Sequence, residues 1–484
     1  MIIRVLLALS LLVPPPARHA TDTTCPVPMP ERTTCGYLEV PERRDAPGTT
    51  IKVGYAVHTA DASVRRPDPI VYMSGGPASS SIQLTGFLAQ MFPDRDIVTV
   101  EQRGSRFSQP RLGCPETVKA MLDRLRGVTS DAGAAAVACR ERLRQQGADL
   151  LGYNTREIAA DVVALRGKLG YPSWNLFGVS YSTRVMVDVA TADPQGVRAI
   201  VLDSFLPEAV SWYGDADRNL AGTVAALGVG DRFERMVRRL NEHPALVPTT
   251  DPLLGTRFTA RLTGNDVATI MAEALHDASV LAVAPALIDA LADGHDELLR
   301  PLADAVGDGL TSHEFGLYHA VQCQDEAIFP GTSRLFTVNT DKAVCAAWKL
   351  PVTQPTKDLR GSTPAGTPPV LVIGGQFDPT TPPRTAGLAA AKLPGATFAE
   401  FSGMGHAVFL ASACARRTIA AFVALPSGWA PPCPSAAAPP RSASCTSRAR
   451  RTRSRSPRGW PRRGCCSSSP RSSSSSAGRS GACP

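Results

Sequence analysis

The chain has 484 residues, of which 43% are hydrophobic and 19% charged, a composition typical of a globular protein with a sizeable core. No uninterrupted apolar run approaches the roughly 18 residues of a membrane span, so we expect no span. The formal net charge is +8, but residues 431–484 hold eleven arginines and no lysine, aspartate or glutamate. Taking these eleven charges from +8 leaves −3 for the rest of the chain, which gives no support to nucleic-acid binding by that part.

The N-terminus has the layout of a secretory signal peptide. Arg4 is followed by an apolar stretch at 5–13, three prolines at 14–16 and a small-residue region that ends near Ala20. A cation, a short apolar segment and a small-residue end predict an export signal at residues 1–20. We therefore expect a secreted or periplasmic protein.

Twelve cysteines are many for a cytosolic enzyme, and they agree with an oxidising compartment. Eight of them fall in sequence-local pairs, although spacing alone cannot choose their connectivity. The sequence has no C-x-x-C pair, no H-E-x-x-H and no other metal-ligand spacing, so it predicts no metal site and no cofactor. The pairing that we favour is Cys25 with Cys35, Cys114 with Cys139, Cys323 with Cys345, and Cys414 with Cys433.

The C-terminal stretch differs from the rest of the chain. From residue 431 onward it contains no Val, Ile, Leu, Met, Phe or Tyr, so it cannot bury enough apolar surface to offset the entropy of ordering. We interpret residues 434–484 as a disordered basic tail. A basic arm for an anionic surface and an out-of-frame translation of a GC-rich gene are the two alternatives.

The first elements in chain order are short and β-like. Two strands, at 36–40 and 50–58, flank a turn at 45–48 and predict a hairpin. Apolar runs at 70–73 and 96–100 follow, each stopped by a glycine-containing segment. Short apolar runs that end in this way are typical of buried strands in a mainly parallel sheet.

Helix and strand then alternate. Asn154 can cap a helix over 155–169, with Glu157 at its third position. A strand at 174–177, a helix from the next turn to about 192 and a strand at 197–202 come after it. This alternation is the signature of a doubly wound α/β domain.

The pattern turns mostly helical over 206–350, without short β-type runs, and predicts an inserted helical cap. The segment 351–368 then leads back to the sheet. Four further elements follow, namely strands at 370–373 and 397–401 and helices at 384–392 and 407–424.

A strand-to-helix turn carries the first candidate for chemistry. Gly178-Val179-Ser180-Tyr181-Ser182 lies between a predicted strand and a predicted helix, which is the context that a nucleophile elbow requires. Such a turn strains the serine backbone, so the residues two before and two after it must be small. Gly178 fits, and Ser182 stands where glycine is usual. Ser180 is the candidate nucleophile.

A serine nucleophile needs a base and an orienting acid, and in this fold they follow in the order acid, then His. Asp378 comes after the strand at 370–373, and His406 lies between glycines after the strand at 397–401. Both are therefore catalytic candidates. Asp203, at the end of another strand, is the rival for the acid.

A tetrahedral intermediate also needs backbone N–H donors for its oxyanion. The residue after the nucleophile, Tyr181, can supply one of them. The glycine turn at Gly75-Gly76-Pro77 can supply the other, because missing side chains let the backbone approach the substrate.

These motifs together resemble the prolyl aminopeptidase and tripeptidyl aminopeptidase branch of the α/β-hydrolases, with the early cysteines and Cys323-Gln324-Asp325 looking like the secreted tripeptidyl type. The resemblance covers about residues 25–433, and Glu101, Ala78 and Ser182 depart from its pattern of Asp, Gly and Gly. It implies an α/β-hydrolase fold, that is, a doubly wound, mostly parallel sheet with an inserted helical cap. The motifs that carry it are Ser74 to Pro77, Glu101 to Ser108, Gly178 to Thr183, Gly374 to Pro382 and Gly403 to His406. The domains that we expect are a signal peptide (1–20), the first part of the core (21–205), the cap (206–350), the second part of the core (351–433) and the tail (434–484).

The resemblance also implies an activity, which is release of one to three residues from the free N-terminus of a peptide through an acyl-enzyme. An exopeptidase of this kind needs acidic groups for the substrate ammonium, and the candidates in the cap are Glu208, Asp325 and Glu326, with Asp325 favoured. The predicted partner is thus a peptide with a free N-terminus. A secreted carboxylesterase or lipase-like hydrolase on the same triad, and a non-catalytic binding protein on this scaffold, are the alternatives.

Overall fold

A computed structural model gives the structure of the chain. It describes residues 24–46, 48–207, 210–326, 329, 331–352 and 368–428. The predicted signal peptide at 1–20, the predicted tail at 434–484 and the candidate Glu208 lie outside the described residues.

Within the described residues, eight strands form one sheet in the order β1-β2-β4-β3-β5-β6-β9-β10. The pairs β1·β2 and β2·β4 are antiparallel, and the other neighbours are parallel. The predicted opening hairpin and the mainly parallel sheet are confirmed. The strands are β1 (Thr33–Pro41), β2 (Thr50–His58), β3 (Arg66–Met73), β4 (Arg95–Val100), β5 (Trp174–Val179), β6 (Val197–Asp203), β9 (Val370–Gly375) and β10 (Ala396–Phe401).

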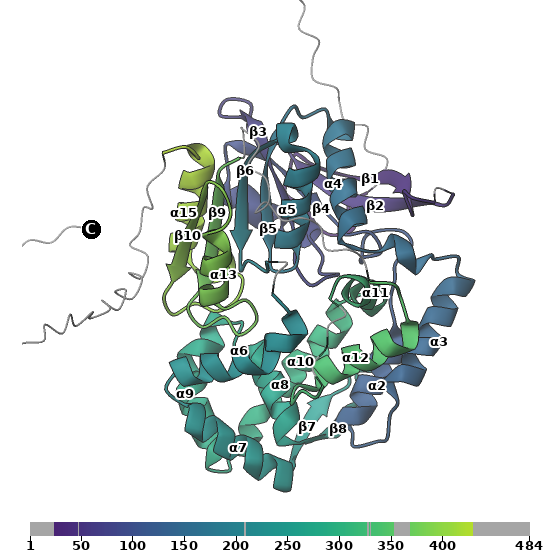
Figure 1. The fold of residues 1–484 in the computed structure, drawn as a ribbon, viewed down its shortest axis with the longest axis vertical. Helices are drawn as coiled ribbons and strands as arrows, with labels where there is room; N and C mark the ends of the chain where they lie inside the picture. The colour runs from purple at the N-terminus through teal and green to yellow at the C-terminus, as the bar shows by residue number, and fades with distance from the viewer. Residues whose placement is uncertain are drawn as a thin grey trace, which may run out of the picture. The chain divides into compact units, whose positions relative to one another are not determined.

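Helices cover both faces of the sheet, which is why its central strands consist of apolar residues with little alternation. Every residue of β5 and β9 is buried. One face packs on α4 (Thr155–Leu169), α5 (Ser182–Ala192) and α13 (Pro383–Ala390). The other packs on α1 (Thr85–Met91), α14 (Val408–Ala411) and α15 (Ala413–Ala424). Figure 1 shows α4 and α5 in front of the strands.

Helix α4 has the predicted bounds, and its caps explain them. The Asn154 Oδ1 accepts from the Glu157 N–H at 3.0 Å, and Gly170 ends the helix with a φ of 72°. The predicted C-terminal helix at 407–424 is instead two helices, α14 and α15. The break falls at Ser412, whose side chain caps α15 by accepting from the Ala415 N–H.

A long insert, residues 210–352 as far as they are described, separates the neighbouring strands β6 and β9. Figure 1 shows its helices gathered at one end of the sheet, together with α2 (Pro115–Leu125) and α3 (Ala132–Gln145). The helices of the insert are α6 (Trp212–Ala226), α7 (Gly230–Glu242), α8 (Gly264–Ala274), α9 (Ala278–Ala292), α10 (Arg300–Ser312), α11 (Phe315–Asp325) and α12 (Phe336–Trp348).

The insert is not purely helical, so the prediction that it lacks β-type runs was wrong. Strands β7 (Ala245–Thr250) and β8 (Arg257–Leu262) form an antiparallel pair. Residues of β7 are alternately buried and exposed, which is the strand period. The sequence did not predict β7 because the run is short and contains Pro248, and proline within a sheet is confined to edges and bulges. Two strands alone are also barely stable, so the pair depends on packing by neighbours such as α10.

The insert contributes to three hydrophobic cores. Helices α6 to α9 and strands β7 and β8 contribute to one of them, around Phe233, Met236 and Ile270. Leu310 of α10 and Phe336 of α12 form a small one with residues of α2. Helices α11 and α12 instead join the main core beneath the sheet through residues such as Val321 and Trp348. They pack there near α2 and α3, two helices that the sequence analysis did not predict.

Three disulfides have the pairing that we favoured: Cys25–Cys35, Cys114–Cys139 and Cys323–Cys345. The second joins the start of α2 to α3, and the third joins α11 to α12. Cys414 is also disulfide-bonded, and Cys433, its favoured partner, lies outside the described residues.

Candidate active site

Ser180 stands at the turn between β5 and α5 with a φ of 57°, a left-handed conformation that costs a non-glycine residue on the order of 1 kcal/mol or more. A Cβ added to Gly178 would lie 2.7 Å from the Ser182 carbonyl oxygen, so only glycine fits there. The Ser182 hydroxyl accepts from the Val179 N–H at 2.8 Å and lies 2.7 Å from the Met73 carbonyl oxygen. The departure from glycine at position 182 thus ties the turn to the end of β3.

The glycine turn after β3 lies directly against this serine. A Cβ added to Gly75 would be 2.7 Å from the Ser180 Cβ and 3.3 Å from its Oγ. Gly76 has a φ of 106°, and Ala78 keeps a positive φ of 76° although it is not glycine. A side chain at position 75 would therefore occupy the space in front of the hydroxyl.

The two residues after β4 hold this turn in place. Gln102, which is fully buried, donates from Nε2 to the carbonyl oxygens of Ser74 and Gly75 at 3.0 and 2.9 Å, and its Oε1 accepts from the Ala78 N–H at 2.9 Å. Glu101 accepts from the backbone N–H groups of Ser81 and Ile82. Glu101 and Gln102 therefore fix the backbone of the glycine turn and of the residues after it, a role that the sequence analysis did not predict.

Asp378 and His406 come together as the sequence predicted them to. The His406 Nδ1 lies 2.7 Å from the Asp378 Oδ2, which also accepts from the Thr381 hydroxyl at 2.6 Å. The Asp378 Oδ1 accepts from the backbone N–H groups of Thr380 and Thr381.

The electrostatics of this pair favour its charged form. Burial by itself would raise the pKa of Asp378, but His406 and these hydrogen bonds hold it well below its usual range. Burial by itself would lower the pKa of His406, but the Asp378 carboxylate raises it above its usual value. The pair can therefore stabilise an imidazolium in a buried place.

Asp203, the alternative candidate for the acid, accepts hydrogen bonds mainly from backbone N–H groups. Its carboxylate accepts from the N–H groups of Val408 and Phe409 at 3.0 and 2.8 Å, and from the Ser204 hydroxyl at 3.1 Å. Burial raises its pKa to about 6. These bonds anchor the chain immediately after His406.

A second histidine, which the sequence analysis missed, comes from the insert. The His276 ring lies 4.7 Å from the His406 ring, centroid to centroid, with 32° between the planes. Its Nε2 is 2.8 Å from the Thr380 Oγ1, and its carbonyl oxygen accepts from the His406 N–H. Nothing in the local sequence marks His276, because it lies in no motif and its neighbours here are distant in the chain.

Asp325 and Glu326, the candidate acids for the substrate ammonium, lie at the end of α11, close to the nucleophile turn. The Asp325 Oδ2 accepts from the N–H and hydroxyl of Thr155 at 2.9 and 2.6 Å. The Thr155 hydroxyl also lies 2.8 Å from the Tyr181 hydroxyl. Glu326 forms an ion pair with Arg184 of α5. The end of α11 is thus bonded to α4, the helix that precedes β5 in the chain, and to α5, the helix that follows it.

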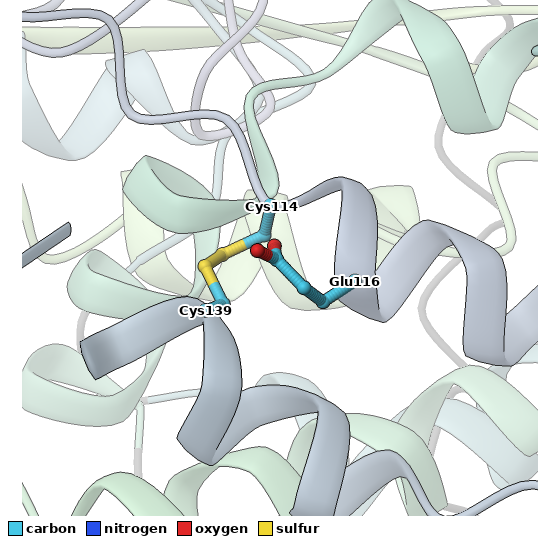
Figure 2. A group of neighbouring side chains, drawn as sticks. All are labelled: Cys114, Glu116 and Cys139. Atoms are coloured by element: carbon cyan, nitrogen blue, oxygen red, sulfur yellow. A yellow bond between two sulfur atoms is a disulfide. The ribbon is translucent and has the colours of Figure 1, made fainter. Parts of the chain in front are cut away.

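Two groups of side chains in the described part of the chain have ligand atoms close enough for a metal ion. In the first, shown in Figure 2, Cys114 and Cys139 are joined as a disulfide, and the Glu116 beside them pairs with Arg142. In the second, His276, Asp378 and His406, the acid and base share a hydrogen bond of 2.7 Å. An ion between these two atoms would need bonds of about 2 Å to each of them, and their separation of 2.7 Å leaves too little room for it. We therefore assign no ion to either group.

The fold and the site define the class of protein. A serine at a strained strand–helix turn, with an Asp–His pair on the loops after β9 and β10, is the arrangement of an α/β-hydrolase. Residues 68–257 match the family model described as alpha/beta hydrolase fold. The chain therefore has the α/β-hydrolase fold and is a serine hydrolase.

A second family model, described as TAP-like protein, matches residues 334–430 in the C-terminal part of the chain. The chain is 26% identical to the serine protease Hip1 of Mycobacterium tuberculosis, over 84% of this chain and 87% of that protein. It is also 26% identical to the tripeptidyl aminopeptidase of Streptomyces lividans, over 73% of this chain and 74% of that protein. The solved proline iminopeptidase of Mycobacterium smegmatis aligns at 15% identity with a TM-score of 0.44, over 80% of this chain and 98% of that one.

Among the described residues, no helix combines the length and the apolar character that crossing a bilayer demands.

Proposed function

We propose that the protein is an exported serine exopeptidase that releases units of one to three residues from the free N-terminus of peptides, with Ser180, Asp378 and His406 as its catalytic triad. The observation that carries the proposal is the 2.7 Å bond between Asp378 and His406, at the same edge of the sheet as the strained Ser180. The printed names of the relatives, a serine protease and a tripeptidyl aminopeptidase, support the peptide substrate.

The chemistry follows from these positions. Asp378 holds the Nδ1–H of His406, which leaves Nε2 to take the Ser180 proton as Oγ attacks the scissile carbonyl. The N–H groups of Tyr181 and of the Gly75-Gly76 turn donate to the oxyanion. His406 then protonates the leaving amine, and water, activated by the same imidazole, releases the N-terminal fragment from the acyl-enzyme.

The insert supports action at chain ends. The end of α11 is bonded to α4 through Asp325 and to α5 through Glu326, which supports the proposal that the insert caps the nucleophile turn. A substrate ammonium in such a place needs an acidic partner. Asp325 is our first candidate, ahead of Glu326 and Glu208, because the disulfide of Cys323 with Cys345 ties the end of α11 to α12.

Export is supported by the signal-like sequence at 1–20 and by three described disulfides, which persist in oxidising compartments.

A labelling experiment tests the nucleophile. An activated serine reacts with a fluorophosphonate probe, so we expect labelling of the wild type and none of Ser180→Ala. Labelling that persists in the variant would place the nucleophile elsewhere.

A substrate panel tests the exopeptidase character. We expect a free-amine di- or tripeptide anilide to be cleaved far faster than its N-acetylated form, and Asp325→Asn to raise KM more than it lowers kcat. Asp293→Asn, an exposed acid of the insert, is the matched control and should change neither. Equal rates on the free and acetylated anilides, or a preference for short-chain esters, would favour the esterase alternative.

A further inference from the structure

The insert contacts the loop of the candidate base at two points. The His276 carbonyl oxygen accepts from the His406 N–H at 3.2 Å. A Cβ added to Gly405 would come within 2.6 Å of the Leu275 and His276 carbonyl oxygens. The backbone of the insert therefore packs directly on the backbone that carries His406.

The His276 side chain adds a third contact, this time with the imidazole of the base. Its ring packs against the His406 ring at 4.7 Å between centroids, with 32° between the planes, and its hydrogen bond with Thr380 connects it to the loop that presents Asp378. Rotation of His406 about its side-chain bonds would have to displace a ring that is itself held. Rigid support of this kind is what a general base needs, because misplacement by about 1 Å can lower the rate of reaction a hundredfold.

The surroundings of His276, burial above all, favour its neutral form. Burial first, and then the charge of His406, lower the pKa of His276. Asp378 acts in the other direction across the ring contact, as does Glu273 of the preceding helix α8, whose Oε2 lies 3.6 Å from the His276 Nδ1. A neutral ring can remain in contact while His406 carries a positive charge during turnover, whereas a second imidazolium would be repelled.

We propose that His276 is a positioning residue, which holds the imidazole of His406 in its productive orientation by packing its ring against it and thereby makes the base dependent on the insert. The inference rests on the Ser180–Asp378–His406 chemistry of the proposed function, but not on its exopeptidase character.

The test compares His276→Ala, which removes the ring, with His276→Phe, which keeps an aromatic ring without charge or polar groups. His295→Ala is the matched control, because His295 is an exposed histidine of the same insert. The readouts are the rate of Ser180 labelling by a fluorophosphonate, which needs no peptide recognition, and kcat and KM on a peptide anilide.

We expect His276→Ala to lower the labelling rate and kcat by about tenfold or more, a part of the 10²–10⁴-fold effect of general-base catalysis, with KM changed less than about threefold. His276→Phe should retain both rates to within about threefold, and His295→Ala should match the wild type. A thermal melt shows whether His276→Ala is folded. If it is not, His276→Gln, which keeps a polar group but no ring, should show the same loss of labelling rate and kcat.

Three results would overturn the inference: unchanged rates in His276→Ala, equal losses in the Ala and Phe variants, or a change confined to KM. Failure of the proposed function looks different. A wild type that labels at Ser180 but does not prefer free-amine substrates contradicts only the exopeptidase activity, and the labelling rates still decide the role of His276. A wild type that does not label at Ser180 would contradict the triad and this inference together.

Discussion

Asp203 and Asp378 offer a controlled comparison within one molecule. Both are buried carboxylates at the carboxyl edge of neighbouring parallel strands, β6 and β9, with 0% and 1% of their surface exposed. Yet the pKa of Asp203 is raised to about 6, while that of Asp378 is held well below its usual range. Equal burial therefore does not decide the charge of a carboxyl group.

The difference comes from what each carboxylate faces. Asp203 accepts from backbone N–H groups of Val408 and Phe409 and from Ser204, which only partly offset the loss of water. Asp378 has comparable backbone donors and, in addition, the His406 ring. We infer that one acid orients the base while the other fixes the chain that follows it.

The largest effect that this comparison predicts is that of Asp378→Asn. An amide at this position cannot stabilise the imidazolium and favours the wrong tautomer of His406, so kcat should fall on the order of a thousandfold or more. Steady-state kinetics on a peptide anilide would measure it. If Asp203→Asn were the more damaging change, the roles that we assign to the two acids would be reversed.

The pH dependence of activity should come next in size. The base acts only when His406 is neutral, and Asp378 raises the pKa of His406 above the usual 6.5. We therefore expect kcat/KM to decrease about tenfold per pH unit below a midpoint above that value. In Asp378→Asn the residual activity should show a midpoint at lower pH, because the carboxylate that raises this pKa is absent. A wild-type midpoint below the usual histidine value would contradict this electrostatic account.

Asp203→Asn should lower kcat by about tenfold at most, because it loosens the chain after His406 without touching the ring.

The difference in stability between the wild type and Asp203→Asn should depend on pH. Since burial raises the pKa of Asp203 to about 6, protonation stabilises the folded wild type as the pH falls from about 6 toward 3.8, and this stabilisation is lost as the pH rises through 6. The variant has no carboxyl group to protonate. Its melting temperature should therefore fall relative to the wild type on acidification, and a constant difference between the two would show that the pKa of Asp203 is not raised.

The smallest effect concerns Ser204, whose hydroxyl donates to the Asp203 carboxylate. Its Oγ accepts from the Ala407 N–H at 2.8 Å, so Ser204→Ala leaves that N–H without this acceptor and should cost about 1–2 kcal/mol of unfolding free energy. Because the hydroxyl does not bond to the imidazole, kcat should change less than about threefold. Denaturant unfolding and kinetics at neutral pH would measure both, and a loss as large as that of Asp378→Asn would give the Asp203 side a direct part in catalysis.

The comparison also shows where prediction from sequence succeeds. Strands such as β5 and β9 and the turn at Ser180 were predictable because apolar runs and terminating glycines act locally. The sequence favoured Asp378 over its rival Asp203, but it could not show the hydrogen-bond partners that separate them, since both acids follow buried strands.

The insert was harder to predict. Strand β7 is short, and its pairing with β8 depends on packing by helices around it. The contact of His276 with His406 and the pairing of Glu326 with Arg184 join residues from different elements that no local motif connects. Such contacts depend on how the insert folds back on the sheet.

The three described disulfides have a consequence for recombinant production. They close loops of 10, 25 and 22 residues, and a crosslink over about 15 residues stabilises a fold by about 3 kcal/mol in the chain-entropy account. Three such contributions are comparable with the roughly 5–15 kcal/mol that a whole domain possesses. Expression in a reducing bacterial cytoplasm should therefore give mostly insoluble chain, and an oxidising host compartment or refolding in a glutathione buffer should be the productive route.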